Sequence, residues 1–439
     1  MIDYSFYQNL NRKILDGDEV TLSQWQGTGG QIPPGEDRPL IYPRIGIYSG
    51  KGCSHSWLWF VDLFERFGFY DLIFLDEAQV KDGQLETLEC LALSGGDTIA
   101  IAEGLGTSGA GQIRQFLGQG GLYLGSCAGA YLPLHSSKEH LEAFNFVEAK
   151  ITNLIKTIPI SISLPEKSLS PYGCDYVYHP VRESVELTAA EEPALSGWGR
   201  FEAPLYGGPG MIPGRECRVL ARYSGFTSKT LFLVDPDLAR ETLLNKAAIL
   251  GHPFGQGSLL LFGPHAEHPY FPEANKLVTD LMAWELNRSG RRIEKDEPPW
   301  AGIFLSGAEI KSWLRGLKRE ISNSRIVANG LETLSIRWLI GNKIYEPIKI
   351  RFFLEALWGR LRTLEKEKTL LLFGEAEQTL PDRARRLTVL LRDLKHTLDD
   401  QGDTLPLAEK LFQDLQGLTR IFLTVYFRSR WSAAVLSLN

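Results

Sequence analysis

From Arg44 onward, short apolar runs alternate with amphipathic stretches, and this alternation restricts the possible folds more than any other feature of the sequence. The runs 44–50, 70–76, 97–103 and 121–126 each have the length of a buried strand. The segments between them have helical character. Large apolar residues recur there at helical spacing, as in Trp57, Phe60, Val61, Phe64 and Phe67. Repeated strand and helix units predict an α/β fold with a mostly parallel sheet covered by helices on both faces.

Beyond Tyr131 the sequence becomes richer in strand-like segments. Residues 179–187, 218–225 and 258–265 are apolar or alternating runs bounded by Gly or Pro, which predicts further strands. Another pattern begins near residue 300, where apolar residues recur every three or four positions and predict helices with one buried face. These stripes consist of Phe353, Leu357, Leu361 and Leu364, and of Leu407, Leu411, Leu415, Leu418 and Phe422.

The length of 439 residues exceeds what one hydrophobic core usually supports, so we expect more than one domain. Residues 1–40 have the character of a short helix and a Gly/Pro-rich connector, which suggests an N-terminal extension and linker. Residues 41–286 carry the α/β pattern. The charged, Pro-containing stretch 287–300 predicts a linker, and residues 301–439 predict a small all-α domain.

Charge and cysteine content exclude several classes of protein. The net charge of −6 is small for this length, and the basic residues after residue 300 are interleaved with acids, so we expect no nucleic-acid or membrane partner. The five cysteines contain no C-x-x-C pair, so neither a disulfide framework, a metal site nor a cofactor is expected. No apolar run approaches a membrane span, which favours a soluble, cytoplasmic location.

The segment 120–134 carries the strongest chemical signal. An apolar strand leads into Gly125-Ser126-Cys127-Ala128-Gly129 and then into a helix-like segment. Small residues on both sides of a nucleophile allow a sharp strand-to-helix turn that lifts the side chain above the sheet edge. The start of the following helix also favours the thiolate form of cysteine. A buried structural cysteine is the alternative, but this glycine frame favours Cys127 as a nucleophile.

A second signal lies at the end of the Leu-rich run 258–262. His265 and Glu267 are spaced two residues apart, so an extended chain places them on one side. Glu267 can then fix the tautomer of His265 while the other ring nitrogen faces a thiol. A surface His near a Glu is the alternative for an isolated pair. His268 is expected on the opposite side, in a structural role.

The sequence Gly104-Leu-Gly106-Thr-Ser-Gly109 has the G-x-G-x-x-G spacing of a dinucleotide-binding turn. That function needs an acid at the end of the next strand, and the next strand ends in the cysteine segment instead. We therefore expect a loop in which the backbone N–H groups of Gly104 and Gly106, with that of Ala128, form an oxyanion hole. The dinucleotide interpretation stays open as the alternative. No Walker A motif occurs in the chain.

Together these segments resemble the class I glutamine amidotransferase-like superfamily, whose fold is flavodoxin-like, and within it the family of the biotin-protein ligase N-terminal domain. The resemblance covers about residues 41–285 and is carried by the first strand, by the cysteine segment, and by the blocks 206–211, 218–225 and 246–268. It places Cys127, His265 and Glu267 on the catalytic triad of the family. The Pro-Gly-Gly turn usual after the third strand corresponds here to residues 102–109, and nothing after residue 290 resembles a ligase domain.

These observations leave three functions to compare. The first is a Cys-dependent amide hydrolase or glutamine amidotransferase-like enzyme acting on glutamine or another small amide. The second is a non-catalytic binding or scaffold module that retains the pocket and recruits a protein partner through its helical tail. The third is an α/β-hydrolase-type esterase, which usually takes its acid and its His from separate loops, whereas here they lie two residues apart.

Overall fold

The computed structural model describes residues 43–157, 177–293, 303–304, 307–366, 371–372 and 374–436. The chain divides into two compact units. The first comprises the α/β segment up to residue 293, without residues 70–74; the second comprises those five residues and the segment after residue 293. The N-terminal extension predicted for residues 1–40 lies outside the described residues.

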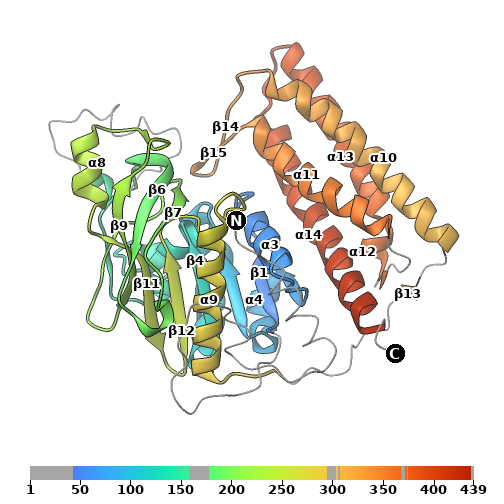
Figure 1. Cartoon of the computed structure of the whole chain (residues 1–439). Helices are drawn as coiled ribbons and strands as arrows, with labels where there is room; N and C mark the ends of the chain where they lie inside the picture. The colour runs from blue at the N-terminus through green and yellow to red at the C-terminus, as the bar shows by residue number, and fades with distance from the viewer. Residues whose placement is uncertain are drawn as a thin grey trace. The chain divides into compact units, whose positions relative to one another are not determined.

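A large mixed sheet forms the centre of the first unit (Figure 1). Its parallel part has the order β12-β4-β3-β1, formed by β12 (Gly257–Phe262), β4 (Leu122–Ser126), β3 (Cys90–Leu93) and β1 (Ile45–Tyr48). These strands are buried along their whole length, as expected for parallel strands covered on both faces. The predicted α/β class is therefore confirmed.

An antiparallel part extends the sheet beyond β12. It contains β11 (Ala247–Phe254), β9 (Arg218–Phe226), β6 (Val181–Ala189) and β7 (Arg200–Leu205). The strands predicted at 179–187, 218–225 and 258–265 correspond to β6, β9 and β12. Four short strands complete the set: β2 (Leu72–Leu75), β5 (Lys150–Ile151), β8 (Met211–Ile212) and β10 (Leu231–Phe232).

Among the described residues of the first unit, α3 (Trp57–Arg66), α5 (Thr98–Gly118) and α9 (Pro272–Ser289) are the longest helices. Helix α3 buries the apolar residues that predicted it, including Trp57, Phe60 and Phe64. Helix α9 ends at Ser289, so the first residues of the predicted linker are helical. The shorter helices are α4 (Glu77–Lys81), α6 (Ala128–Tyr131), α8 (Pro236–Leu243), η1 (Gln84–Thr87), η2 (Glu139–Phe144), η3 (Ile155–Thr157) and η4 (Pro193–Leu195).

The prediction of a strand over residues 97–103 was wrong. The third strand of the sheet is β3, and Asp97 begins helix α5 by accepting hydrogen bonds from the N–H groups of Ile99 and Ala100, at 3.0 and 3.2 Å. Apolar and small residues alternate in this segment, as they do in a strand. The N-terminal cap of Asp97 decides for the helix because it satisfies N–H groups that the first turn leaves free.

The second unit is helical. Its long helices are α10 (Gly307–Glu332), α11 (Pro347–Leu364), α13 (Leu380–Asp399) and α14 (Leu405–Leu436), with the short α12 (Glu375–Gln378). A small hairpin pairs β14 (Trp338–Ile340) with β15 (Lys343–Tyr345). Strands β13 (Ile303–Phe304) and β16 (Leu371–Leu372) pair antiparallel although helices α10 and α11 separate them in the chain. The apolar stripe Phe353, Leu357, Leu361 and Leu364 is buried in α11, as predicted.

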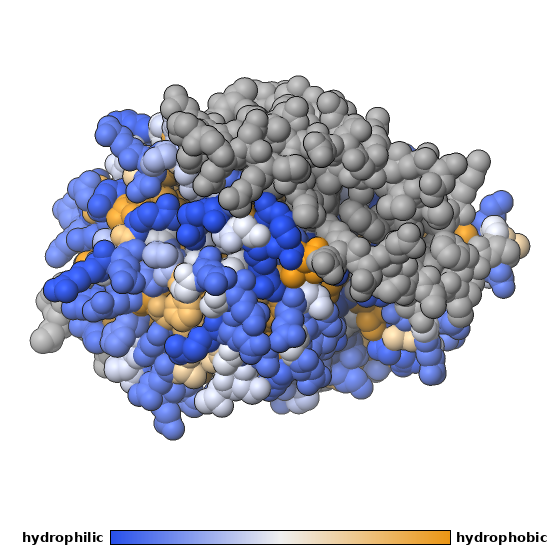
Figure 2. Space-filling model, turned by 90° about the horizontal axis from the view of Figure 1, so that it is seen from below, coloured by the Kyte–Doolittle hydropathy of each residue, from blue (hydrophilic) through white to orange (hydrophobic). Residues whose placement is uncertain are grey.

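Figure 2 shows a face of the molecule on which hydrophilic side chains predominate and apolar residues form small scattered patches. Among the described residues, every helix is too short or too polar to cross a lipid bilayer.

Candidate active site

Cys127 stands directly after strand β4 and caps helix α6, in a strained backbone conformation with φ 49° and ψ −109°. Positive φ angles are unusual for residues other than glycine and occur at functional sites more often than elsewhere. The turn is fixed by the N–H of Cys127, which donates to the carbonyl of Phe262 at 3.0 Å. Cys127 thus occupies the sharp strand-to-helix turn that its flanking glycines predict.

Those glycines are required by close backbone contacts. A Cβ atom on Gly125 would lie 2.3 Å from the carbonyl oxygen of Gly129, and one on Gly129 would lie 1.9 Å from that of Leu93. Both distances are far inside van der Waals contact, and the opposing atoms belong to the backbone. The small residues around Cys127 therefore let the turn pack against β3.

Strand pairing brings the two predicted parts of the site together. Strands β4 and β12 are parallel neighbours, and their last residues Ser126 and Phe262 lie opposite each other. Cys127 and the segment with His265 consequently leave the sheet at the same edge, although 138 positions separate the two residues in the chain. The carboxyl ends of parallel strands are the usual place for sites in open α/β sheets.

His265 links Cys127 to Glu267. Its Nδ1 atom lies 2.7 Å from Oε1 of Glu267, and its side chain also forms a hydrogen bond with Cys127. Since Nδ1 is engaged by the carboxylate, Nε2 is the atom that faces the thiol. Burial lowers the pKa of His265, but the Glu267 carboxylate and Cys127 outweigh it and raise the pKa well above its usual range. The raised pKa favours the protonated, imidazolium form of His265 beside Cys127.

Glu267 is held by hydroxyl donors as well as by the imidazole. Ser126 donates to Oε1 at 2.6 Å and Ser94 donates to the same oxygen at 2.9 Å. The carboxylate is 1% exposed, so burial raises its pKa; the charge of His265 and these hydrogen bonds more than offset that effect and lower the pKa. Three donors on one oxygen keep Glu267 ionised and oriented toward the ring.

A chain of serine hydroxyls extends from Glu267. Ser56 Oγ lies 3.0 Å from Ser94 Oγ, and Ser54 Oγ lies 3.0 Å from Ser56 Oγ. The sequence interpretation missed Ser56, Ser94 and Ser126 as members of the site. Ser126 adjoins Cys127 in the chain, but only the pairing of β4 with β12 shows that its hydroxyl reaches Glu267.

The loop beside the cysteine turn is different from the predicted one. Gly104 and Gly106 lie within helix α5, which kinks at Gly106, and the loop that follows β3 is Ser94-Gly95-Gly96. A Cβ atom on Gly95 would lie 2.7 Å from Cε1 and 3.1 Å from Nε2 of His265. Gly95 therefore sits directly against the imidazole. The loop after the third strand is therefore 94–96 and not 102–109, because β3 ends at Leu93 and residues 102–109 belong to α5.

Aromatic side chains surround the imidazole. The rings of Trp59 and Tyr206 lie 5.0 and 5.8 Å from that of His265, and the ring of His268 lies 4.4 Å from Trp59 and 6.2 Å from Tyr206. We name Trp59, Tyr206 and His268 the aromatic wall. The expectation that His268 faces away from the site was wrong, because residues 265–268 form a turn, closed by the N–H of His268 donating to the carbonyl of His265 at 3.0 Å, and are not extended.

His268 is neutral in this environment. The N–H of Tyr270 donates to its Nδ1 at 3.3 Å, which leaves the proton on Nε2. Burial and the neighbouring His265 lower the pKa of His268 to about 4. The surroundings thus favour the charged form of His265 and the neutral form of His268. Among the described residues, no group of His, Cys, Asp and Glu has the arrangement of a metal site.

The strand order and the cysteine turn at the end of β4 define an α/β fold with a mixed sheet, in which the parallel strands β4 and β12 end at the candidate site. Residues 44–142 match the family described as the N-terminal domain of biotin-protein ligase, which confirms the resemblance over this segment. The matched residues include Cys127, whereas His265 and Glu267 lie beyond them. No curated protein is significantly similar to the chain.

Solved structures with a similar arrangement include three bacterial proteins. A cytoplasmic protein of Salmonella typhimurium has 10% identity and a TM-score of 0.33, with 55% of this chain and 98% of that one covered. A ThuA-like protein from Bacteroides uniformis has 12% identity and a TM-score of 0.33, with 60% and 95% covered. A glutamine amidotransferase from Thermotoga maritima has 10% identity and a TM-score of 0.32, with 57% and 99% covered.

Proposed function

We propose that the first unit is a thiol-dependent amide hydrolase or amidotransferase-like enzyme in which Cys127 is the nucleophile, His265 the base and Glu267 the orienting acid. One observation carries the proposal: the strained Cys127, the buried His265 and the buried Glu267 form a continuous hydrogen-bonded series at one sheet edge. Nucleophile, base and orienter within hydrogen-bond reach are the signature of covalent catalysis. The substrate is glutamine or another small carboxamide.

The reaction begins when Sγ of Cys127 attacks the carboxamide carbon and forms a tetrahedral intermediate. His265 then gives its Nε2 proton to the leaving nitrogen, the C–N bond breaks, and ammonia and a thioester result. Water attacks the thioester next and transfers a proton to His265. The C–S bond breaks, the acid leaves, and the thiolate is restored beside the imidazolium.

The negative oxygen of the intermediate needs N–H donors. We propose those of Ala128 and Gly95 for this role. Within the described residues neither N–H has an acceptor, Ala128 follows Cys127 directly, and Gly95 adjoins His265. Gly104 and Gly106 are replaced in this proposal because they belong to α5 and not to a loop at the sheet edge.

An electrophilic diazoketone analogue of glutamine tests the function. We expect one covalent adduct on Cys127 by peptide mass spectrometry, and its loss in His265→Ala. Cys217 is the internal control, because burial raises its pKa and its thiol is only half-buried. Equal labelling of Cys217 and Cys127, or labelling of Cys127 that does not depend on His265, would contradict the catalytic proposal and favour the scaffold hypothesis.

A further inference from the structure

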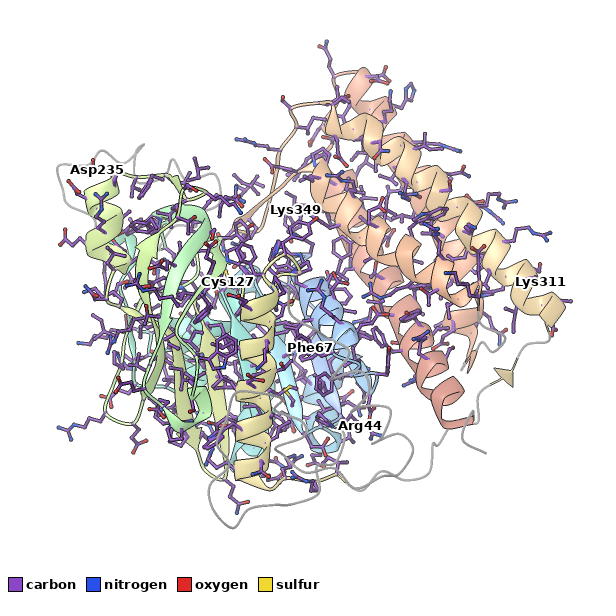
Figure 3. All side chains as sticks on the ribbon, viewed as in Figure 1. Arg44, Phe67, Cys127, Asp235, Lys311 and Lys349 are labelled. Carbon is purple, nitrogen blue, oxygen red and sulfur yellow. The ribbon has the colours of Figure 1, made fainter. Side chains whose placement is uncertain are left out.

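The helical unit contains a cavity of about 850 Å³ bordered by helices α10 and α11. Its basic side chains are Lys311, Arg315, Lys318, Arg319 and Lys366, and we name this cavity the basic groove. Lys311, labelled in Figure 3, projects outward from the first part of α10. Nothing in the proposed amide chemistry uses this part of the chain, so the groove calls for its own explanation.

The charge of the groove is strongly positive. Five Lys and Arg residues line it, against one acid, Glu365. Glu365 is already occupied, because both of its oxygens accept from Lys318 at 2.7 and 2.8 Å. Arg319 is paired with Glu320 at 2.9 Å. In the part of the chain that the structure describes, Lys311, Arg315 and Lys366 have no ion-pair partner, so they remain available to an anionic ligand.

The spacing of these cations is unfavourable for the helix itself. Lys311, Arg315 and Arg319 follow each other at intervals of four residues, which places three like charges in one row on α10. Like charges at this spacing destabilise a helix. A row of about 12 Å, given a rise of about 1.5 Å per residue, is longer than a single phosphate group and matches an extended or helical peptide.

The floor of the groove is apolar and aromatic. Ile310 and Leu314 are 6% and 5% exposed, and Trp358 is half-buried. The cationic groups of Lys318 and Arg325 lie over the Trp358 ring, 5.6 and 4.6 Å from its centre. Because two cationic groups already lie over its ring, Trp358 is poorly placed to stack on a nucleic-acid base. An apolar floor edged by free cations fits a ligand that carries both apolar and acidic side chains.

We propose that the basic groove binds an acidic, amphipathic segment of a partner protein. Carboxylates of the segment pair with Lys311, Arg315 and Lys366, and its apolar side chains lie over Ile310 and Leu314. The proposal is independent of the amide chemistry at Cys127, since every residue in it belongs to the helical unit.

Fluorescence polarisation of the full chain tests the proposal, with a labelled peptide in which Glu and Leu residues are interspersed as the probe. We expect saturable binding that weakens with salt. The double variant Lys311→Glu/Arg315→Glu should bind at least about tenfold more weakly. Arg386→Glu/Arg392→Glu is the matched control: it makes the same charge change on exposed positions of α13, and binding should change by less than about twofold. Circular dichroism establishes that both variants fold.

Three outcomes would overturn the proposal. Equal weakening by the two double variants would mean that the probe senses only overall charge. A single-stranded oligonucleotide could bind more tightly than the peptide and lose this binding in Lys311→Glu/Arg315→Glu. That result would assign the groove to nucleic acid. A dimer in sedimentation that the same variant dissociates would identify a second copy of the chain as the occupant.

Discussion

At the scale of single residues, one carboxylate oxygen organises the candidate site. Oε1 of Glu267 accepts from His265, Ser126 and Ser94, all within 2.9 Å. The sequence predicted the His and the Glu because they share a strand end, and the Cys because its glycine frame is distinctive. The serines could not be predicted, because their partner lies more than 140 residues away and hydroxyl side chains have no characteristic spacing.

Replacing Ser126 by Ala should weaken the Cys127 and His265 pair while preserving the fold. The carboxylate loses a charge-assisted hydrogen bond, its pKa rises, and it stabilises the imidazolium less. We expect alkylation of Cys127 by iodoacetamide at neutral pH to slow by about tenfold. Ser54→Ala is the matched control because Ser54 bonds Ser56 and the Gly95 carbonyl but not Glu267. Equal rates in the two variants would show that Ser126 does not position the acid.

His268 should make the fold sensitive to mild acid. Its pKa is about 4 when folded and about 6.5 when unfolded, so the unfolded chain binds more protons between these values. The contribution of neutral His268 to the free energy of unfolding is therefore complete above about pH 6.5. It decreases as the pH falls toward 4, by up to about 1 kcal/mol per pH unit. Urea unfolding of the wild type and His268→Gln at several pH values measures this. The variant should show the shallower pH dependence, and identical slopes would refute the prediction.

At the scale of elements, the turn between β4 and α6 could be predicted from the sequence pattern. The cysteine segment was predicted correctly because glycines flank a residue that must occupy a tight turn, and such frames are rare by chance. Helix α5 was partly misread as a strand, because large apolar and small residues alternate over 97–103 and the third strand is only four residues long. A short strand carries too little sequence to outweigh a longer alternating run beside it.

Gly129→Ala should be severely destabilising. The added methyl group would lie 1.9 Å from the Leu93 carbonyl, and neither backbone segment can move without disturbing the paired strands. We expect a loss of about 3 kcal/mol or more in the free energy of unfolding. Gly118→Ala, in α5, is the matched control: its methyl group meets nothing within 4 Å, and alanine should stabilise the helix by about 0.5 kcal/mol. Chemical denaturation distinguishes the two, and a mild effect at Gly129 would mean that the turn can relax.

At the scale of the whole molecule, the α/β class and the helical C-terminal region could both be predicted, because each has its own apolar periodicity. The domain boundaries at residues 286 and 300 remain a prediction. The basic groove could not be foreseen, because the charges after residue 300 look balanced along the sequence: 22 Lys and Arg stand against 16 Asp and Glu. Helix packing gathers five of the cations around one cavity. A sum over the sequence cannot reveal such a local concentration.

The adjacency of β4 and β12 gives Cys127 a further use as a folding reporter. His265 follows β12 in the chain, so it reaches Cys127 only when this strand has paired with β4, and the Phe262 carbonyl that accepts from the Cys127 N–H arrives with the same strand. Enhanced thiol reactivity would thus mark the moment at which β12 has paired with β4. Pulsed alkylation of the Cys127 thiol during refolding would therefore measure when this pairing forms, with no added dye.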